Sequence, residues 1–129
     1  MPNKIISYTF PYYPNSDTYS VVIRAAIKYL DYVSMSQGTQ AYVDDLIEMG
    51  VPKHKIVWGQ ILYRDCGMVK TIEAAEAVVA NQYGGVMTWS INSDTYQRNN
   101  DEAGACTEFQ TGKPDASFIN TVSYILNHH

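Results

Sequence analysis

The feature that most constrains this chain is a fourfold alternation of short apolar runs with amphipathic segments. The apolar runs are rich in β-forming residues, and their starts lie about 24–30 residues apart, the length of one strand plus one helix. They cover Lys4–Phe10, Asp31–Ser36, Lys55–Tyr63 and Gly85–Ile91. Runs this short and this apolar are typical of strands buried on both faces of a parallel sheet.

Helical patterns fill the spaces between these runs. Their apolar residues recur on one stripe over 18–30, 40–49 and 69–82, and a last helix is expected to start near Pro114. Ser16 or Asp17 is a suitable N-cap for the first helix, and Gly50 followed by Pro52 is a typical stop for the second. The order is therefore βα repeated four times, which predicts an α/β fold with a parallel sheet and right-handed crossovers.

Composition places the chain among globular domains and excludes several classes of function. With 129 residues, 46% of them hydrophobic, the sequence predicts a single unit over 1–129. A formal net charge of −4 gives no electrostatic basis for binding nucleic acid or an anionic membrane. There is no apolar run of about 18 residues and no signal peptide at the start of this sequence. No glycine-rich phosphate loop follows any run and no metal-ligand spacing is present, so we expect no cofactor and no metal.

Ligands of parallel α/β folds bind at the carboxyl ends of the strands, so the residues after each run define a candidate rim. Those residues are Pro11, Tyr12 and Tyr13; Gln37, Gly38 and Thr39; Tyr63, Arg64, Asp65 and Cys66; and Ser90, Asn92 and Asp94. Trp89 lies one step below the last group. The segment 92–113 lacks periodicity, and a loop of that length in a compact domain is usually functional or mobile.

The two cysteines fall at this same rim. Cys66 follows the third run and Cys106 lies in the long rim loop. In a secreted protein they are expected to form a disulfide that pins the loop, and in a reducing compartment they stay as two free thiols. The sequence leaves both alternatives open.

The apolar runs also carry a family resemblance. "YGGVMTWSINSDT" resembles the eighth strand of glycoside hydrolase family 18, the chitinases and endo-β-N-acetylglucosaminidases, which typically reads G-G-x-M-x-W-S. "KIVWGQILYRD", "YLDYVSMSQGT" and "KIISYTFPYY" resemble the seventh, sixth and fifth strands. The resemblance implies four parallel βα units equivalent to the second half, strands 5–8, of a (β/α)8 TIM barrel.

The same resemblance implies a glycosidase that acts on β-1,4-linked N-acetylglucosamine, as in chitin or N-glycan cores, outside the cell. Family 18 enzymes use the substrate's own acetamido group and one glutamic acid on a D-x-x-D-x-D-x-E segment. That segment is absent here, since the nearest acidic cluster, Asp44-Asp45-x-x-Glu48, lies in a helical pattern. The sixth-strand tip lacks the family's tyrosine, and no proline follows Gly59. The chain alone is therefore predicted to be inactive.

The resemblance also assigns roles to rim residues. Trp89 is expected to form the floor of a sugar subsite, with Tyr63 and Arg64 hydrogen-bonded to the sugar and Asn92 and Asp94 as further hydroxyl contacts. The alternatives are a plain core role for Trp89 and a rim ion pair between Arg64 and an aspartate, Asp65 or Asp94. Trp58 is expected to be a packing residue.

Four parallel strands leave two open edges, which favours pairing with a partner. The sequence leaves three interpretations open. The other half of the barrel lies outside this chain, or two copies close a barrel as a homodimer, or the chain is a small flavodoxin-like domain. In function, the alternatives to a hydrolase half are a non-catalytic, lectin-like chitin- or glycan-binding protein and a half-barrel assembly module. The expected ligand is an oligosaccharide containing N-acetylglucosamine.

Overall fold

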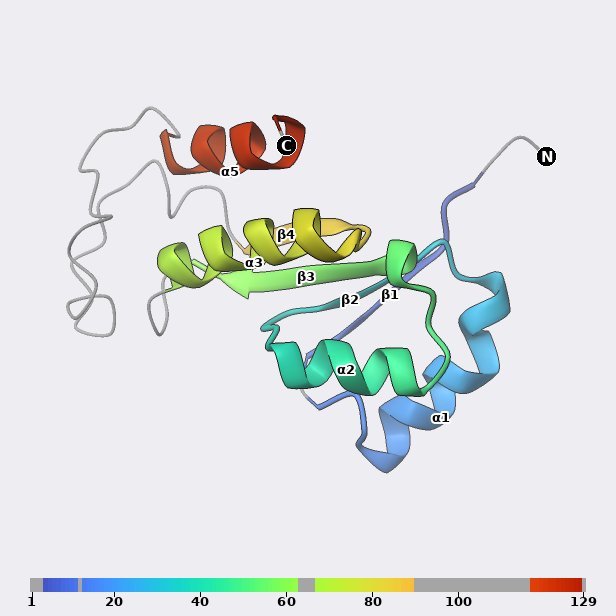
Figure 1. Ribbon diagram of the computed structural model, residues 1–129. Coiled ribbons are helices and arrows are strands. Elements are labelled where there is room, and N and C mark those ends of the chain that lie inside the picture. The colour runs from blue at the N-terminus through green and yellow to red at the C-terminus, as the bar shows by residue number, and fades with distance from the viewer. Residues whose placement is uncertain (1–3, 12, 63–66, 90–116, 129) are drawn as a thin grey trace.

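The computed structural model describes residues 4–11, 13–62, 67–89 and 117–128, which form an α/β fold (Figure 1). The elements in chain order are β1 Ser7–Phe10, α1 Asp17–Ala26, η1 Ile27–Tyr29, β2 Tyr32–Met35, α2 Gln40–Glu48, η2 Lys53–Lys55, β3 Ile56–Ile61, α3 Gly67–Asn81, β4 Gly85–Trp89 and α5 Ser117–Asn127. The four strands are all parallel and lie in the order β1-β2-β3-β4. The predicted α/β class with a parallel sheet is confirmed.

Short polar side chains and unusual backbone angles fix the helix ends. The Ser16 hydroxyl accepts a hydrogen bond from the Tyr19 amide at 3.4 Å, and Thr39 caps α2 in the same way through the Tyr42 amide at 3.3 Å. After α2, Gly50 adopts a φ of +95°, a conformation that glycine enters without steric cost. Of the two predicted N-caps for the first helix, Ser16 and Asp17, the structure has Ser16, and the predicted stop at Gly50 is confirmed.

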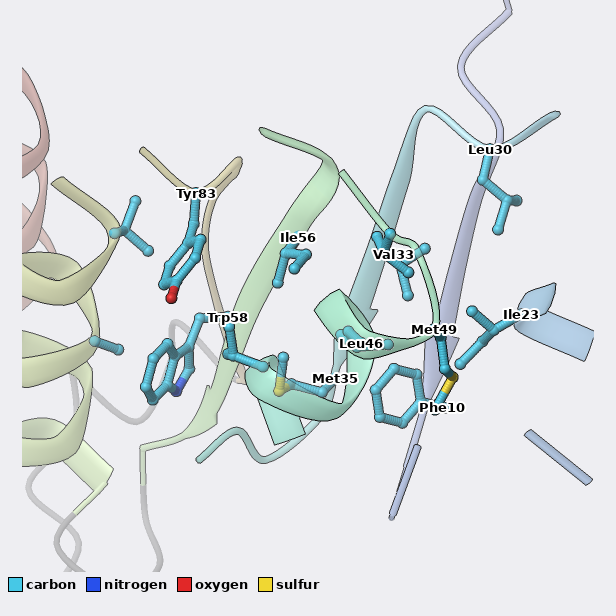
Figure 2. Close-up of a cluster of buried hydrophobic side chains, with 14 residues drawn as sticks. Phe10, Ile23, Leu30, Val33, Met35, Leu46, Met49, Ile56, Trp58 and Tyr83 are labelled. Carbon is cyan, nitrogen blue, oxygen red and sulfur yellow. The ribbon is translucent and has the colours of Figure 1, made fainter. Parts of the chain in front are cut away.

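All the described helices pack on one face of the sheet. Residues level with one another in a parallel sheet point to the same side, and Tyr8, Val33 and Ile56 are level. This side also carries Phe10, Met35 and Trp58, and together these residues form the main hydrophobic core with Ile23 of α1, Val43 and Leu46 of α2, and Ala74 and Val78 of α3 (Figure 2). Figure 1 shows α3 along β3 and β4, with α5 beside α3.

The strand order explains this one-sided covering. When consecutive strands are neighbours and every crossover is right-handed, each helix is laid on the same side of the sheet. A flavodoxin-like sheet instead reverses its strand order near the middle, which sends helices to both faces. The order β1-β2-β3-β4 does not match that pattern, so the described strands do not support the flavodoxin-like interpretation.

The opposite face, which we call the open face, carries no helix from the described part of the chain. Its side chains, placed by the same registers, are Ser7 and Thr9, Tyr32 and Ser34, Val57 and Ile61, and Met87 and Trp89. Tyr32 is 39% exposed and Trp89 is 61% exposed. The expectation that the strands are buried on both faces is therefore wrong for this side, because the helices cover only the other.

The strands are also staggered. Ser7 and Tyr32 start β1 and β2 at the same level. The start of β3 lies one residue further along, since Val33 rather than Tyr32 is level with Ile56. β4 starts one residue further again, because Gly85 is level with Val57. A closed barrel of eight strands with a shear of 8 needs an average stagger of about one residue per strand.

Gly59 lets the end of β2 lie unusually close to β3. A Cβ at this position would overlap the backbone carbonyl oxygen of Met35, the last residue of β2. The Gly59 carbonyl accepts a hydrogen bond from the Gly38 amide at 2.7 Å, which holds the chain after β2 against β3. The obstacle is backbone rather than a flexible side chain, so it cannot move aside cheaply.

Replacing Gly59 with Ala is therefore expected to lower the free energy of unfolding by about 3 kcal/mol or more, at the upper end of overpacking costs. Urea denaturation followed by circular dichroism measures this loss. Ser7→Ala, on the exposed edge strand, is the matched control and should change stability by less than about 0.5 kcal/mol. Equal stability of the two variants would contradict the close approach of Met35 to Gly59.

Candidate functional site

Trp89 is the predicted site residue that lies within the described part of the chain. Tyr63, Arg64, Asn92 and Asp94 lie outside it, as do both members of the Cys66–Cys106 pair and the rim loop 92–113. The roles proposed for those residues stay predictions. The site can be built from Trp89 and from its described neighbours on the open face and the rim.

Trp89 is the last residue of β4, at the carboxyl edge of the sheet. Its carbonyl oxygen accepts a hydrogen bond from the Leu62 amide at 2.9 Å, which holds its backbone against the end of β3. It is level with Ile61, so its side chain leaves the sheet on the open face, where 61% of the residue is exposed. Met87 lies two residues before it on the same face. A rigid strand thus presents a large, accessible aromatic surface beside two apolar neighbours.

Trp58, on the adjacent strand, has the opposite environment. It points to the helix-covered side and is only 7% exposed (Figure 2). Gly38 leaves the space that its ring fills, since a Cβ there would come within 2.5 Å of the indole Cδ1. Among the described residues its buried Nε1 has no hydrogen-bond partner. The prediction that Trp58 is a packing residue is confirmed.

The open face has a polar side and an apolar side. On β1 and β2, the hydroxyls of Thr9 and Ser34 lie 2.6 Å apart and share a hydrogen bond. On β3 and β4, the corresponding side chains are apolar or aromatic. Sequence analysis did not single out Thr9 and Ser34, although the alternation Ser-Tyr-Thr-Phe in β1 is the period-2 signal of a half-buried strand.

Two tyrosines meet at the carboxyl edge near β1 and β2. The rings of Tyr13 and Tyr42 pack edge to face with centroids 5.4 Å apart, and Tyr13 is 61% exposed. Partial burial raises the pKa of the Tyr42 hydroxyl, and the charge and hydrogen bond of Tyr13 raise it further. Tyr42 is therefore protonated at neutral pH. Sequence analysis placed Tyr13 at the rim but took Tyr42 only as part of a helix stripe.

Tyr13→Phe is expected to lower the pKa of Tyr42 toward its ordinary value, because it removes both contributions of the Tyr13 hydroxyl while keeping the ring contact. The remaining burial keeps part of the shift. An NMR or ultraviolet pH titration that resolves Tyr42 measures this change. An unchanged Tyr42 titration would mean that the two hydroxyls do not interact.

Other kinds of site are limited in the described residues. No cluster of His, Cys, Asp and Glu there could hold a metal ion. No helix there has both the length and the apolar character to cross a membrane. A hollow of about 410 Å³ lies between α3, α5 and the start of β4, at the opposite end of β4 from Trp89. It is therefore separate from the candidate site.

Comparison with protein-family models, curated proteins and solved structures gave no match to this chain. The class that the described residues define is an α/β protein with a parallel sheet covered by helices on one face. The family-18 resemblance remains a hypothesis that rests on the quoted motifs.

Proposed function

We propose that this chain is the glycan-binding second half of a family-18-like glycoside hydrolase barrel, with Trp89 as the floor of a sugar subsite. The observation that carries the proposal is the position of Trp89, exposed on the open face at the carboxyl edge of the last strand. The ligand is a β-1,4-linked N-acetylglucosamine oligomer, as in chitin or an N-glycan core, met outside the cell. The catalytic acid comes from residues outside this chain.

Three features of the sheet support the barrel. The strands follow one another in sequence order, the helices lie on one side only, and the strand starts advance along the sheet. In a (β/α)8 barrel, the helices form the outer ring and the opposite face of the sheet lines the interior. The open face then becomes half of the barrel interior, and the edge that holds Trp89 becomes half of the rim where active sites lie.

The two sides of the open face suit an amphipathic sugar ring. One face of a pyranose is lined by C–H groups, and an indole that covers it contributes about 1–3 kcal/mol by burying apolar area. Ile61 and Met87 extend this apolar floor. The exposed hydroxyl of Thr9, which Ser34 orients, and the proposed rim residues Tyr63 and Arg64 offer hydrogen bonds to the sugar hydroxyls.

The chemistry of hydrolysis needs one group that this face does not hold among its described residues. Substrate-assisted cleavage requires an acid that protonates the leaving oxygen while the acetamido carbonyl attacks the anomeric carbon. The described open face carries hydroxyl, aliphatic and aromatic side chains. The acidic cluster Asp44-Asp45-x-x-Glu48 lies on α2 in the helix layer, where Asp44 accepts a hydrogen bond from Gln40.

The exposed indole of Trp89 equally supports a second candidate, a non-catalytic glycan-binding protein that keeps the aromatic floor without the acid. Both candidates predict sugar binding through Trp89. They differ in whether turnover appears once the other half of a barrel is supplied.

Binding is expected to change tryptophan fluorescence when chitotetraose is titrated into the protein. The chain has two tryptophans, so Trp58→Phe leaves Trp89 as the only emitter, and the sugar-induced change should persist in that variant. Because Trp58 donates no hydrogen bond to the described residues, its replacement by phenylalanine removes no hydrogen bond there. Trp89→Ala should weaken binding about 10–100-fold, measured by calorimetry.

Circular dichroism of both variants controls for folding. A flat titration in the wild type and in Trp58→Phe, with both proteins folded, would reject sugar binding at this site.

The chain alone should release no fluorophore from a fluorogenic chitobioside over the uncatalysed rate. The physical reason is the missing proton donor for the leaving oxygen. Turnover that survives repurification and disappears in Trp89→Ala would show that an acid has been overlooked.

A further inference from the structure

We propose that two copies of this chain close on each other about a two-fold axis, so that β4 of each pairs in parallel with the segment Lys4–Phe10 of the other. The product is an eight-stranded barrel with two identical junctions. This inference rests on the barrel architecture of the proposed function, is independent of the sugar, and puts a second copy in the place of the other half of the barrel.

The exposed apolar side chains gather at the two ends of the sheet. Among the described residues, nine large hydrophobic residues are exposed, and eight of them belong to the first and last βα units: Ile5, Ile6, Tyr13, Val21, Val22, Tyr29, Trp89 and Tyr124. Between these units, α2, β3 and α3 contribute none among their described side chains, and β2 contributes Tyr32, which is 39% exposed. This distribution fits a molecule whose two ends are covered by a partner.

The exposed area is also sufficient for a dimer. Trp89 is left out of the area, because the proposed function keeps it open to a sugar. Six of the other seven residues are at least 53% exposed and the seventh, Val22, is 38% exposed. Taking about 150–250 Å² for a large aromatic side chain and somewhat less for an aliphatic one, they expose on the order of 700 Å² per copy. A standard protein interface buries about 800 Å² per partner. Pairing of the strand edges adds backbone area and satisfies free N–H and C=O groups.

The segment before β1 already has the shape of a strand. The Ile6 amide donates to the Asp31 carboxylate at 2.8 Å, and the Ile6 carbonyl accepts from the Asp31 amide at 2.8 Å. These two bonds hold Ile6 against the start of β2, yet Ile5 is 73% exposed and Ile6 is 53% exposed. Two exposed isoleucines on an edge strand offer an apolar template for pairing with another strand.

The stagger fixes a register for the junction. A barrel of eight strands and shear 8 advances four residues for every four strands. In the observed registers, Tyr8, Val33 and Ile56 are level. Adding the advance of four residues at the junction places Thr88 level with the partner's Tyr8, and Val86 level with the partner's Ile6. Both pairs match helix-side residues with helix-side residues, as a continuous sheet requires.

The surroundings of β4 fit that register. Val86 and Leu126 of α5 both pack against the buried cluster of Leu62, Ala75 and Val122. The hollow of about 410 Å³ lies next to Val86 along the chain and is lined by Tyr83, Gly85 and Leu126 among others. The partner's Ile6, level with Val86 and pointing to the same side, would enter this apolar region. The partner's Ile5 would point into the barrel interior.

The first test is the mass of the full chain in solution. Sedimentation equilibrium at micromolar concentrations should give twice the 14.5 kDa mass of one chain. Ile6→Lys should raise the dissociation constant of the dimer at least 10-fold, because it sets a charge in the apolar junction. Ala41→Lys is the matched control, since it adds the same charge on the exposed face of α2 and should leave the dimer unchanged.

The second test checks the register by oxidative cross-linking, in a background with Cys66 and Cys106 changed to Ser. Ile6→Cys with Val86→Cys in one chain should give a covalent dimer on a denaturing gel. Ile5→Cys with Val86→Cys places the two thiols on opposite faces and should cross-link at least 10-fold more slowly. Equal rates for the two pairs would overturn the register.

A wild-type monomer at 100 µM, open-ended aggregates instead of dimers, or a dimer that both lysine variants leave intact would each overturn the proposal. The sugar titration separates its failure from that of the proposed function. A monomer that binds chitotetraose rejects the dimer alone, whereas a dimer that binds no sugar leaves the dimer standing and rejects the glycan site.

Discussion

The structure depends on one constraint, the placing of every described helix on the same side of a parallel sheet. When consecutive strands are neighbours and their crossovers are right-handed, every helix lies on the same side of the sheet. The other face of the sheet is then left without a helix layer. A doubly wound sheet avoids this by reversing its strand order. This chain does not reverse, so the strands carry two kinds of side chain. Those toward the helices form the core, and those on the open face are hydroxyl-bearing on β1 and β2 and mostly apolar on β3 and β4.

The two tryptophans show how strand register turns this constraint into different roles. Trp58 and Trp89 lie on neighbouring strands, but they belong to opposite faces of the sheet. One fills a space left by Gly38 in the core, and the other remains exposed at the carboxyl edge. A one-residue slip of either strand would exchange the two environments. Contacts that fix the strand register, such as the close approach of Met35 to Gly59, therefore maintain the candidate site as well as the core.

Much of the fold could be predicted from the sequence because local signals agreed with the final packing. The caps at Ser16 and Gly50, and the alternation of apolar runs with amphipathic segments, located the elements closely. β4 begins at the expected Gly85, whereas Lys4–Phe10 shortens to Ser7–Phe10, since an edge strand pairs on one side only. The sequence could not reveal which strand face lacked helices, because a continuous apolar run has no periodicity that distinguishes its two sides. The roles of Thr9, Ser34 and Tyr42 depend on neighbours distant in sequence, so they became visible only in the fold.

Acrylamide quenching of single-tryptophan variants measures whether Trp89 faces solvent on the open face while Trp58 lies in the core. We expect red-shifted emission and efficient quenching when Trp89 is the only tryptophan, and blue-shifted, protected emission when Trp58 is the only one. Protected, blue-shifted emission from Trp89 would contradict the open face and the sugar site built on it.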